Sequence, residues 1–331
     1  MKRPYAPRIV AMGGGTGLST MLRGLKGYAG DLTAIVTVAD DGGGSGVLRQ
    51  ELGMPPPGDI RNCIQALANT EPTMEALLAY RFTDGSLTGQ SFGNLFLAAL
   101  CGMSASFDEA VAKMSEVLAV TGRVLPVTNE QVRLIAEFED GSRVHGESKI
   151  ASYKKGSDSR IRRVCLEPTT ASVLPACLTA IERAELIVLG PGSLYTSLIP
   201  NLLVGGVAEA VARTDAVKVY ILNIMTQDGE TESYRASDHI RAMFDHGAPG
   251  LFDYCLANSL AIPETVLARY REEGATPTDI DEREILRLGV QLARAPVAGW
   301  QGGLVRHDPD RLAAAVMELF REKTRTRIFA G

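Results

Sequence analysis

The chain alternates between short apolar runs and amphipathic segments, which is the pattern of an α/β protein. An apolar run at residues 8–12 leads into a glycine cluster and then into helical spacing over residues 18–25. Residues 32–39 are apolar throughout and rich in β-branched side chains, as expected for a parallel strand covered on both faces. Two strands joined through a helix predict a right-handed βαβ unit that opens a doubly wound sheet.

The spacing of apolar residues changes twice in the middle of the chain. It is helical over residues 59–67, 73–81, 94–100 and 106–120, and has a period of two between residues 121 and 166, where Asp140-Gly141 is typical of a hairpin turn. Residues 171–184 and 310–323 predict helices, and residues 186–189 and 217–222 predict buried strands. We therefore predict a doubly wound α/β core from residues 1–120 and 172–331, and an inserted antiparallel, β-hairpin-rich subdomain at residues 121–171.

Composition excludes several classes of protein. Of the 331 residues, 45% are hydrophobic and 22% charged, so the chain can bury a substantial core. A formal net charge of −5 provides no positive field for a nucleic acid, and no nucleic-acid partner is expected. The chain has neither a long uncharged apolar stretch nor a secretion signal, and its five cysteines form no C-x-x-C pair. We expect a cytoplasmic protein with reduced cysteines and no membrane insertion.

Glycines cluster where predicted strands end, at residues 13–17, 42–46 and 190–192. Ligands of open parallel sheets bind at this edge, where helix N-termini point N–H groups at an anion. The first cluster lacks both the lysine of a Walker loop and the third glycine of a dinucleotide fingerprint, and it is compatible with a nucleotide diphosphate. A single turn of this kind could merely close a strand-to-helix corner, but three favour a phosphate-bearing ligand. The candidate contacts are Gly14, Gly15, Thr16, Gly17, Gly190, Gly192, Ser193, Leu194 and Thr196.

Two aspartates follow the second predicted strand. An acidic residue at this place binds ribose in a dinucleotide fold, so Asp40 and Asp41 are candidate ligand contacts. Two adjacent carboxylates could instead hold Mg²⁺ beside substrate phosphates, or cap a helix. The sequence leaves these alternatives open.

Further polar candidates open predicted helices or leave a strand. Asp59 is either an N-cap or a metal ligand, and Arg61 and Asn62 would join it in a ligand-binding cluster. Asn94 fits an N-cap and a ligand contact equally well. Asn223 begins a polar segment, residues 223–231, which suits a specificity loop.

No catalytic residue can be assigned from the sequence. The four histidines show no H-E-x-x-H spacing and no cysteine partner, so a zinc site is not expected. A G-x-S-x-G nucleophile elbow is also missing from the sequence, so hydrolase chemistry has no support.

Six ordered motifs resemble those of the bacterial gluconeogenesis factor family, which is similar in turn to the 2-phospho-L-lactate transferases. They are GGGTGLS at 13–19, VADDGGGSG at 38–46, PPGDIRN at 56–62, SFGNL at 91–95, GPGSLYTSLIPNLL at 190–203 and MTQDGET at 225–231. The resemblance spans nearly the whole chain. It implies a three-layer α/β/α Rossmann-like sandwich with a mainly parallel sheet.

The resemblance also implies a function and a site. Gluconeogenesis factors support cell shape and wall synthesis on gluconeogenic carbon sources, and some bind UDP-sugars such as UDP-N-acetylglucosamine. The transferases use Mg²⁺ and a lactyl group activated by guanosine diphosphate. By this resemblance Thr16 and Gly17 would line the nucleotide site, Asp40, Asp41 and Asp59 would take the place of the transferases' acidic groups, and residues 190–197 would cradle the diphosphate. Thr20 stands where the transferases carry a lysine, which favours binding without turnover.

Three hypotheses follow. The first is a UDP-sugar-binding regulatory protein that acts on a protein partner the sequence does not identify. The second is a Mg²⁺-dependent transferase in which Asp59 and either Asp40 or Asp41 hold the metal. The third, an NAD-dependent oxidoreductase, is permitted by the glycine turn but lacks an acid–base pair in the C-terminal half. We also expect a homo-oligomer, with a dimer as the expected form, and no cofactor other than Mg²⁺.

Overall fold

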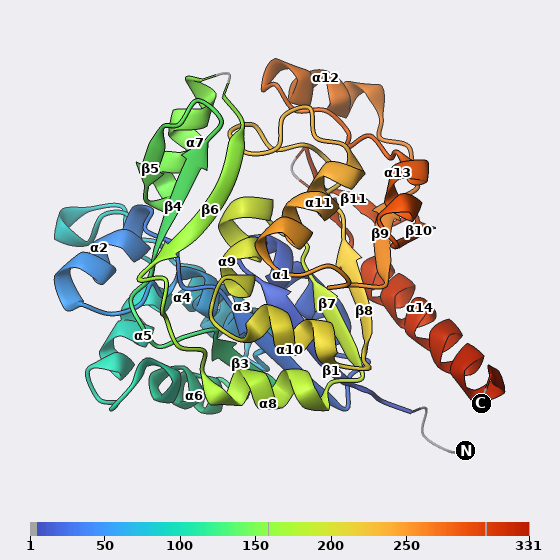
Figure 1. Cartoon of the computed structure of the whole chain (residues 1–331). Coiled ribbons are helices and arrows are strands. Elements are labelled where there is room, and N and C mark those ends of the chain that lie inside the picture. The colour runs from blue at the N-terminus through green and yellow to red at the C-terminus, as the bar shows by residue number, and fades with distance from the viewer. Residues whose placement is uncertain (1–4, 158, 302, 331) are drawn as a thin grey trace.

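The computed structural model describes residues 5–157, 159–301 and 303–330, and its centre is a seven-stranded sheet (Figure 1). The strand order is β10-β9-β8-β7-β1-β2-β3, and every neighbouring pair is parallel. The strands are β1 (Arg8–Gly13), β2 (Asp31–Val36), β3 (Arg123–Pro126), β7 (Leu186–Leu189), β8 (Val217–Ile221), β9 (Tyr254–Asn258) and β10 (Gln291–Ala295). The predicted doubly wound sheet is therefore confirmed, and its strand order reverses between β1 and β7.

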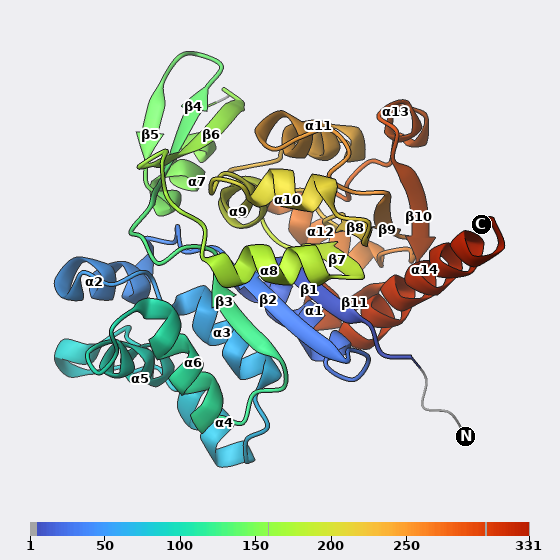
Figure 2. The same ribbon diagram turned by 60° about the horizontal axis from the view of Figure 1, so that its bottom comes forward.

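Helices cover both faces of the sheet, as the predicted three-layer sandwich requires (Figure 2). One layer contains α1 (Gly15–Leu25), α3 (Gly58–Leu67), α6 (Phe107–Val117) and α14 (Pro309–Ala330). The other contains α8 (Pro175–Arg183), α10 (Val207–Arg213), α11 (Ala236–His246) and α13 (Glu282–Arg287). The remaining helices are α2 (Gly43–Leu52), α4 (Pro72–Ala79), α5 (Phe92–Cys101), α7 (Glu147–Lys155), α9 (Ile199–Leu202) and α12 (Glu264–Glu272). None of the described helices is both long and apolar enough to cross a membrane.

The second strand is shorter than its apolar run. β2 ends at Val36, although residues up to 39 are apolar. The Thr37 N–H still donates to the Gly13 carbonyl at 3.0 Å, after which the chain leaves the sheet while Val38 and Ala39 stay buried. The apolar character of Val38 and Ala39 therefore reflects burial rather than strand pairing.

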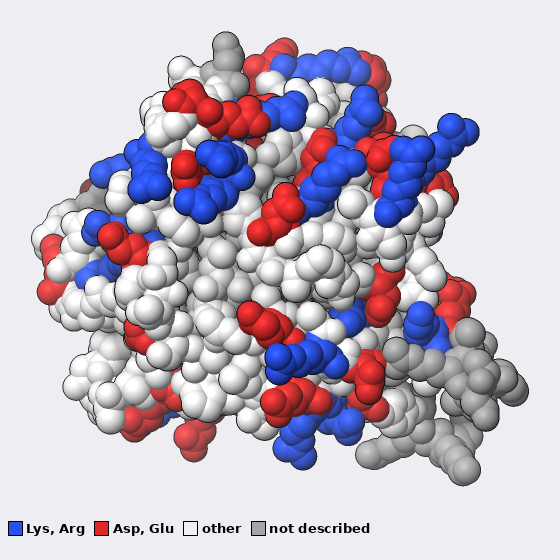
Figure 3. All heavy atoms as spheres, viewed as in Figure 1, with Lys and Arg blue, Asp and Glu red and all other residues white. Residues whose placement is uncertain are grey.

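The inserted segment differs from the prediction in two ways. β3 lies within residues 121–171, yet it pairs with β2 in the large sheet. The small antiparallel sheet has only β4 (Arg133–Phe138), β5 (Arg143–His145) and β6 (Ile161–Glu167). Residues after β5, which we assigned to the period-two stretch, form α7, because Ile150 and Lys154 point to one buried face at helical spacing. Lys and Arg side chains gather over β4 and β6 in Figure 3.

The C-terminal third contains elements that the sequence did not predict. β9 and β10 extend the sheet, and β11 (Ala298–Gln301) pairs with β12 (Leu304–His307) in an antiparallel hairpin. A small apolar cluster of Met225, Tyr270, Ala275 and Val305 joins α12 to this hairpin, apart from the main core. This second cluster holds the hairpin beyond the carboxyl ends of the strands.

Candidate functional site

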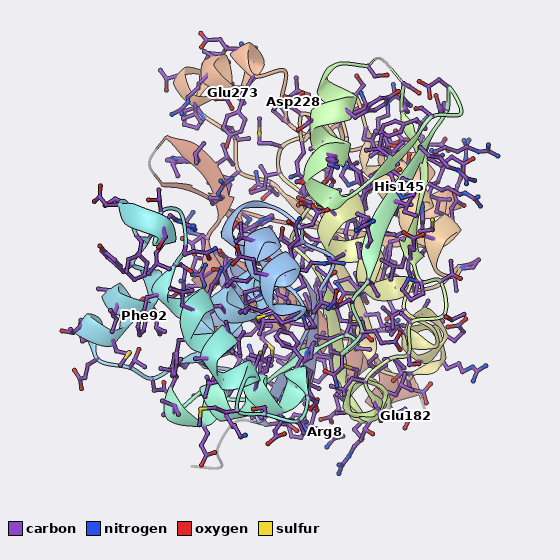
Figure 4. All side chains as sticks on the ribbon, turned by 90° about the vertical axis from the view of Figure 1, so that its left-hand side faces the viewer. Arg8, Phe92, His145, Glu182, Asp228 and Glu273 are labelled. Carbon is purple, nitrogen blue, oxygen red and sulfur yellow. The ribbon has the colours of Figure 1, made fainter. Side chains whose placement is uncertain are left out.

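A cavity of about 470 Å³ opens at the carboxyl ends of β1 and β7, where the strand order reverses. Figure 4 shows this polarity: Arg8, at the start of β1, lies at one end of the molecule, and the insert with His145 and the α12 region with Glu273 lie at the other. Open α/β sheets bind their ligands at such switch points, and the volume suits a small-molecule ligand. The lining comprises Gly14, Gly15, Thr16, Gly17, Thr20, Asp40, Asp59, Glu147, Pro191, Gly192, Ser193, Thr196, Ser197, Asn223, Ile224, Met225, Thr226, Gln227, Tyr270, Val305, Arg306 and His307.

The N-terminus of α1 forms one wall of the cavity. The helix begins at Gly15, directly after β1, and its N-cap Gly14 provides no side chain to satisfy the first N–H groups. Asp59 accepts a hydrogen bond from the Gly15 N–H. A Cβ on Gly14 would stand 2.5 Å from Asp59 Oδ2, so this close approach requires glycine. The wall thus combines the remaining N–H groups of the first turn with a helix dipole that favours an anion.

The loop after β7 forms the opposite wall and packs directly on α1. A Cβ on Gly17 would lie only 2.4 Å from the carbonyl oxygen of Pro191, so the two walls can be this close only with glycine at position 17. Beyond the loop, residues Leu194–Leu198 form a π-helical turn that presents Thr196 and Ser197 to the cavity. Such π turns occur frequently at functional sites.

The segment that leaves β8 braces this loop. Asn223 Nδ2 donates to the Gly192 carbonyl at 2.8 Å, and Gln227 Nε2 donates to Ser193 Oγ at 2.8 Å. Asn223 and Gln227 also contact each other at 3.3 Å. The predicted specificity loop therefore fixes the position of the glycine loop as well as lining the cavity.

Glu230, near the end of that segment, anchors the π-helical turn that follows this loop from the protein interior. Its carboxylate accepts from Thr196 Oγ1 at 2.7 Å and from the Tyr195 N–H at 3.2 Å. Burial raises the pKa of Glu230 to about 7, although the hydrogen bonds from Thr196 and Tyr195 oppose that shift. Glu230 is thus a buried carboxyl group that orients a hydroxyl of the cavity wall.

Carboxylates concentrate at the β2 end of the cavity. Asp40 follows β2, Asp59 lies in the first turn of α3, and Glu147 is the first residue of α7 in the insert. Burial raises the pKa of Asp59 to about 6 and that of Glu147 to about 7, and in both groups repulsion from Asp40 adds to the shift. The pKa of Asp40 is raised by burial as well. This end of the cavity favours hydroxyl donors or a cation.

A divalent cation fits these residues only in part. Within the described residues, no three histidine, cysteine or carboxylate side chains are arranged to hold a metal ion by themselves. Mg²⁺ is often held by one or two carboxylates together with substrate phosphates, which Asp40 and Asp59 could provide on the cavity wall. The protein would then bind the metal only together with a phosphate-bearing ligand.

The structure answers two of the alternatives left open by the sequence. Ser91, not Asn94, is the N-cap of α5, and its hydroxyl accepts from the Asn94 N–H at 3.2 Å. Asp59 is not an N-cap either, because the N-cap of α3 is Pro57. The N-cap interpretation is therefore wrong for both residues.

Several predicted contacts lie behind the cavity wall rather than on it. Arg61 Nε donates to Asn94 Oδ1 at 3.3 Å, so these two residues contact each other, and neither lines the cavity. Asp41 accepts from the Ser148 N–H at 2.9 Å and thereby ties the insert to the segment that follows β2. Gly190 turns the chain out of β7, and Leu194 is fully buried. Predicted residues outside the lining are Asp41, Arg61, Asn62, Asn94, Gly190 and Leu194; those within it are Gly14, Gly15, Thr16, Gly17, Asp40, Asp59, Gly192, Ser193, Thr196 and Asn223.

The sequence missed the lining residues contributed by the insert and by the C-terminal elements. Glu147 follows a glycine and is not part of any motif that would mark it as a site residue. Tyr270, Arg306 and His307 belong to elements that we did not predict. Only tertiary contacts bring these residues to the carboxyl edge of the sheet. Gln227 could have been predicted from the sequence, because it lies in the predicted specificity loop.

Comparison with known proteins gives similarity along nearly the whole chain. The family described as 2-phospho-L-lactate transferase CofD matches residues 9–298. The gluconeogenesis factor of Bacillus subtilis is 48% identical over 317 residues, covering 96% of this chain and 99% of that protein. That of Listeria innocua is 42% identical over 324 residues, covering 98% of each. A crystal structure of a Bacillus halodurans protein matches with a TM-score of 0.92 at 46% identity, covering 95% of this chain and 100% of that one.

Proposed function

The chain belongs to the CofD family and, within it, to the gluconeogenesis factors, and from this premise we propose that it is a cytoplasmic UDP-sugar-binding regulatory protein. Occupancy of the cavity would change the contacts of the surrounding loops with a protein partner. Through that partner, the protein would adjust cell shape and cell-wall synthesis during growth on gluconeogenic carbon sources.

One observation carries the binding proposal: two amide-bearing walls, α1 and the loop after β7, face one cavity at the switch point of the sheet. Backbone N–H groups at a helix N-terminus stabilise a pyrophosphate without any cationic side chain. The lining continues past these walls to Asp40 and Glu147 in one direction and to Tyr270 in the other, so groups attached to either end of a diphosphate would meet protein.

Binding without turnover is supported by the chemistry of the lining. Thr20 lies in the wall, and its hydroxyl donates to the Thr16 carbonyl at 2.9 Å, so it provides no positive charge. Among the described residues, Arg306 is the only lysine or arginine that lines the cavity. A phosphoryl or lactyl transfer would need charge stabilisation at the reacting phosphate, and a single arginine in the lining supplies little of it.

Calorimetric titration tests the proposal. The full chain is titrated with UDP-N-acetylglucosamine, UDP-glucose, GDP and NAD under identical buffer conditions. We expect saturable heat with the two UDP-sugars and weaker or no binding of NAD. If neither UDP-sugar binds, the proposal is wrong.

The alternative is a Mg²⁺-dependent transferase that uses a nucleotide-activated small acid, as the family description suggests. The group of Asp40, Asp59 and Glu147 favours it, since carboxylates with raised pKa values would be stabilised in their charged form by a cation. Asp59→Asn should then abolish both Mg²⁺-dependent ligand binding and turnover of a supplied activated donor. Unchanged behaviour of this variant would exclude the alternative.

The proposed assembly is a dimer. Light scattering after size-exclusion chromatography measures its mass, with and without UDP-N-acetylglucosamine. A monomer at micromolar concentration in both conditions would contradict this part of the proposal.

A further inference from the structure

The small sheet of the insert turns one of its faces to solvent. Strand alternation in β4 directs Leu134, Ala136 and Phe138 inward, where all three are buried, and leaves the residues between them on the outside. We call the outer residues of the three strands the arginine face, over which basic side chains gather in Figure 3. It comprises Arg133, Ile135 and Glu137 on β4, Arg143 and His145 on β5, and Arg162, Arg163, Cys165 and Glu167 on β6.

A β-bulge places two consecutive arginines on this face. Glu137 on β4 pairs with Arg163, but the next residue of β4 pairs with Ile161, so the register skips Arg162. The side chains of Arg162 and Arg163 are 68% and 60% exposed. In regular alternation one of two consecutive residues would point inward. Bulges re-aim side chains in this way and are frequent beside functional sites.

Three arginines share the single carboxylate of Glu137. Arg163 Nε donates to it at 2.7 Å. Guanidinium nitrogens of Arg143 and Arg162 lie 3.8 Å from its oxygens. The hydrogen bond from Arg163, together with the charges of all three arginines, lowers the pKa of Glu137. One negative charge cannot neutralise three positive charges, so a positive surplus faces solvent.

The positive charge of the insert contrasts with that of the whole chain. Residues 133–167 contain eight lysines or arginines and six aspartates or glutamates, a net charge of +2 within a chain of −5. An acidic partner would therefore be attracted to the insert and repelled by the remainder of the molecule. Such complementarity guides the orientation in which two proteins meet.

The middle of the arginine face is apolar. Ile135 pairs with His145 on one side and with Cys165 on the other, and both Ile135 and Cys165 are half-buried. The face is also small, because three strands span only about 10 Å. A phosphate backbone would meet the carboxylates of Glu137 and Glu167 as well as this apolar centre. An extended protein segment that alternates acidic and apolar side chains fits both features.

Helix α7 connects the insert to the cavity. Its first residue, Glu147, lines the cavity, and the N–H of Ser148 donates to Asp41 at 2.9 Å. Near its other end, Lys154 Nζ lies 3.3 Å from Glu232 Oε2, directly after the predicted specificity loop. The insert is thus attached to the segments that follow β2 and β8, and both of these segments line the cavity.

Resting on the proposed function, we propose that the arginine face is the surface on which the protein partner docks, and that the partner presents an extended segment of alternating acidic and apolar side chains. Arg143 and Arg162 pair with its carboxylates, while Arg163 keeps its bond to Glu137. Ile135 contacts an apolar side chain of the segment.

A peptide titration in the absence of nucleotide provides the first test. A short fluorescein-labelled peptide alternates glutamate and leucine, and its control has glutamine in place of every glutamate. Fluorescence anisotropy with the full chain at low ionic strength should show saturable binding of the acidic peptide only, and added salt should weaken it. Equal binding of the two peptides, or binding of neither, would overturn the inference.

The double variant Arg143→Gln/Arg162→Gln provides the second test. It removes the positive surplus and leaves Arg163 in place. The matched control, Arg271→Gln/Arg287→Gln, removes the same charge from two exposed arginines that each pair with one glutamate elsewhere on the surface. The first variant should bind the acidic peptide about fivefold more weakly, as for two exposed charge pairs, and the control should bind as the unmodified protein does. Equal affinities of the two variants would contradict the role of the arginine face.

An oligothymidylate of the same net charge as the peptide distinguishes a nucleic-acid surface. We expect it to bind more weakly than the acidic peptide. If it binds more tightly and loses affinity in Arg143→Gln/Arg162→Gln, the surface recognises a nucleic acid and the inference is wrong. Because these titrations contain no UDP-sugar, their failure is distinguishable from failure of the calorimetry that tests the proposed function.

Discussion

Replacing Gly17 by alanine should separate the two walls of the cavity. The added Cβ would stand 2.4 Å from the Pro191 carbonyl oxygen. Carbon–oxygen contacts settle at about 3.3 Å or more, so α1 and the loop must move apart by about 0.9 Å. An amide-to-phosphate hydrogen bond of about 2.9 Å would be stretched beyond the range in which it is effective.

The consequence for binding is larger than the consequence for folding. A hydrogen bond to a charged group contributes about 2 kcal/mol, and its loss weakens binding about 30-fold. Overpacking destabilises the fold by about 1–3 kcal/mol, but alanine recovers up to about 1 kcal/mol because it is the better helix former. We therefore expect a modest fall in Tm together with a large rise in Kd for UDP-N-acetylglucosamine.

Gly27→Ala is the matched control. Gly27 lies just after α1, is exposed, and has no atom within 4 Å of an added Cβ. Both variants are measured by calorimetry and by thermal unfolding. We expect the control to match the unmodified protein in both. If Gly17→Ala binds the UDP-sugar as tightly as the control does, the two walls do not hold the ligand together.

Other expected outcomes concern the buried carboxyl groups. The pKa of Asp59 is about 6 in the folded protein and about 4 in the unfolded chain, so the folded state binds more protons between these values and its stability falls as pH rises through them. In urea unfolding, the free energy of unfolding of Asp59→Asn should therefore rise relative to that of the unmodified protein between pH 4 and pH 6.5. A difference between the two free energies that stays constant with pH would refute this. Glu230→Ala should lower the free energy of unfolding by about 2 kcal/mol, because Thr196 Oγ1 and the Tyr195 N–H lose their acceptor. Glu230→Gln retains an amide oxygen and should lose less, and equal losses in the same assay would contradict the role assigned to the carboxylate.

Local patterns were sufficient to predict the centre of the fold. The run before Gly13 is apolar because β1 is covered on both faces, and the glycines after it are required by close contacts of α1 with Asp59 and Pro191. A strand, a glycine turn and a helix depend on neighbouring residues, so one stretch of sequence contains the information. The same holds for the loop at residues 190–193.

The rest of the site depends on contacts between distant segments. Glu147 reaches the cavity because the N–H of its neighbour Ser148 donates a hydrogen bond to Asp41, which lies 107 positions earlier in the sequence. His307 reaches it because a hairpin packs on Met225 and Tyr270, in a cluster too small to leave a long periodic signal. Helical spacing in α7 was hidden by the alternating strands on either side. These placements result from tertiary packing, for which a single sequence gives no local sign.

A crystal structure of the full chain with UDP-N-acetylglucosamine tests the central claim most directly. The account predicts that the two phosphates lie between the first turn of α1 and residues 191–193. Phosphates found at any other surface, with this cavity unchanged, would contradict it.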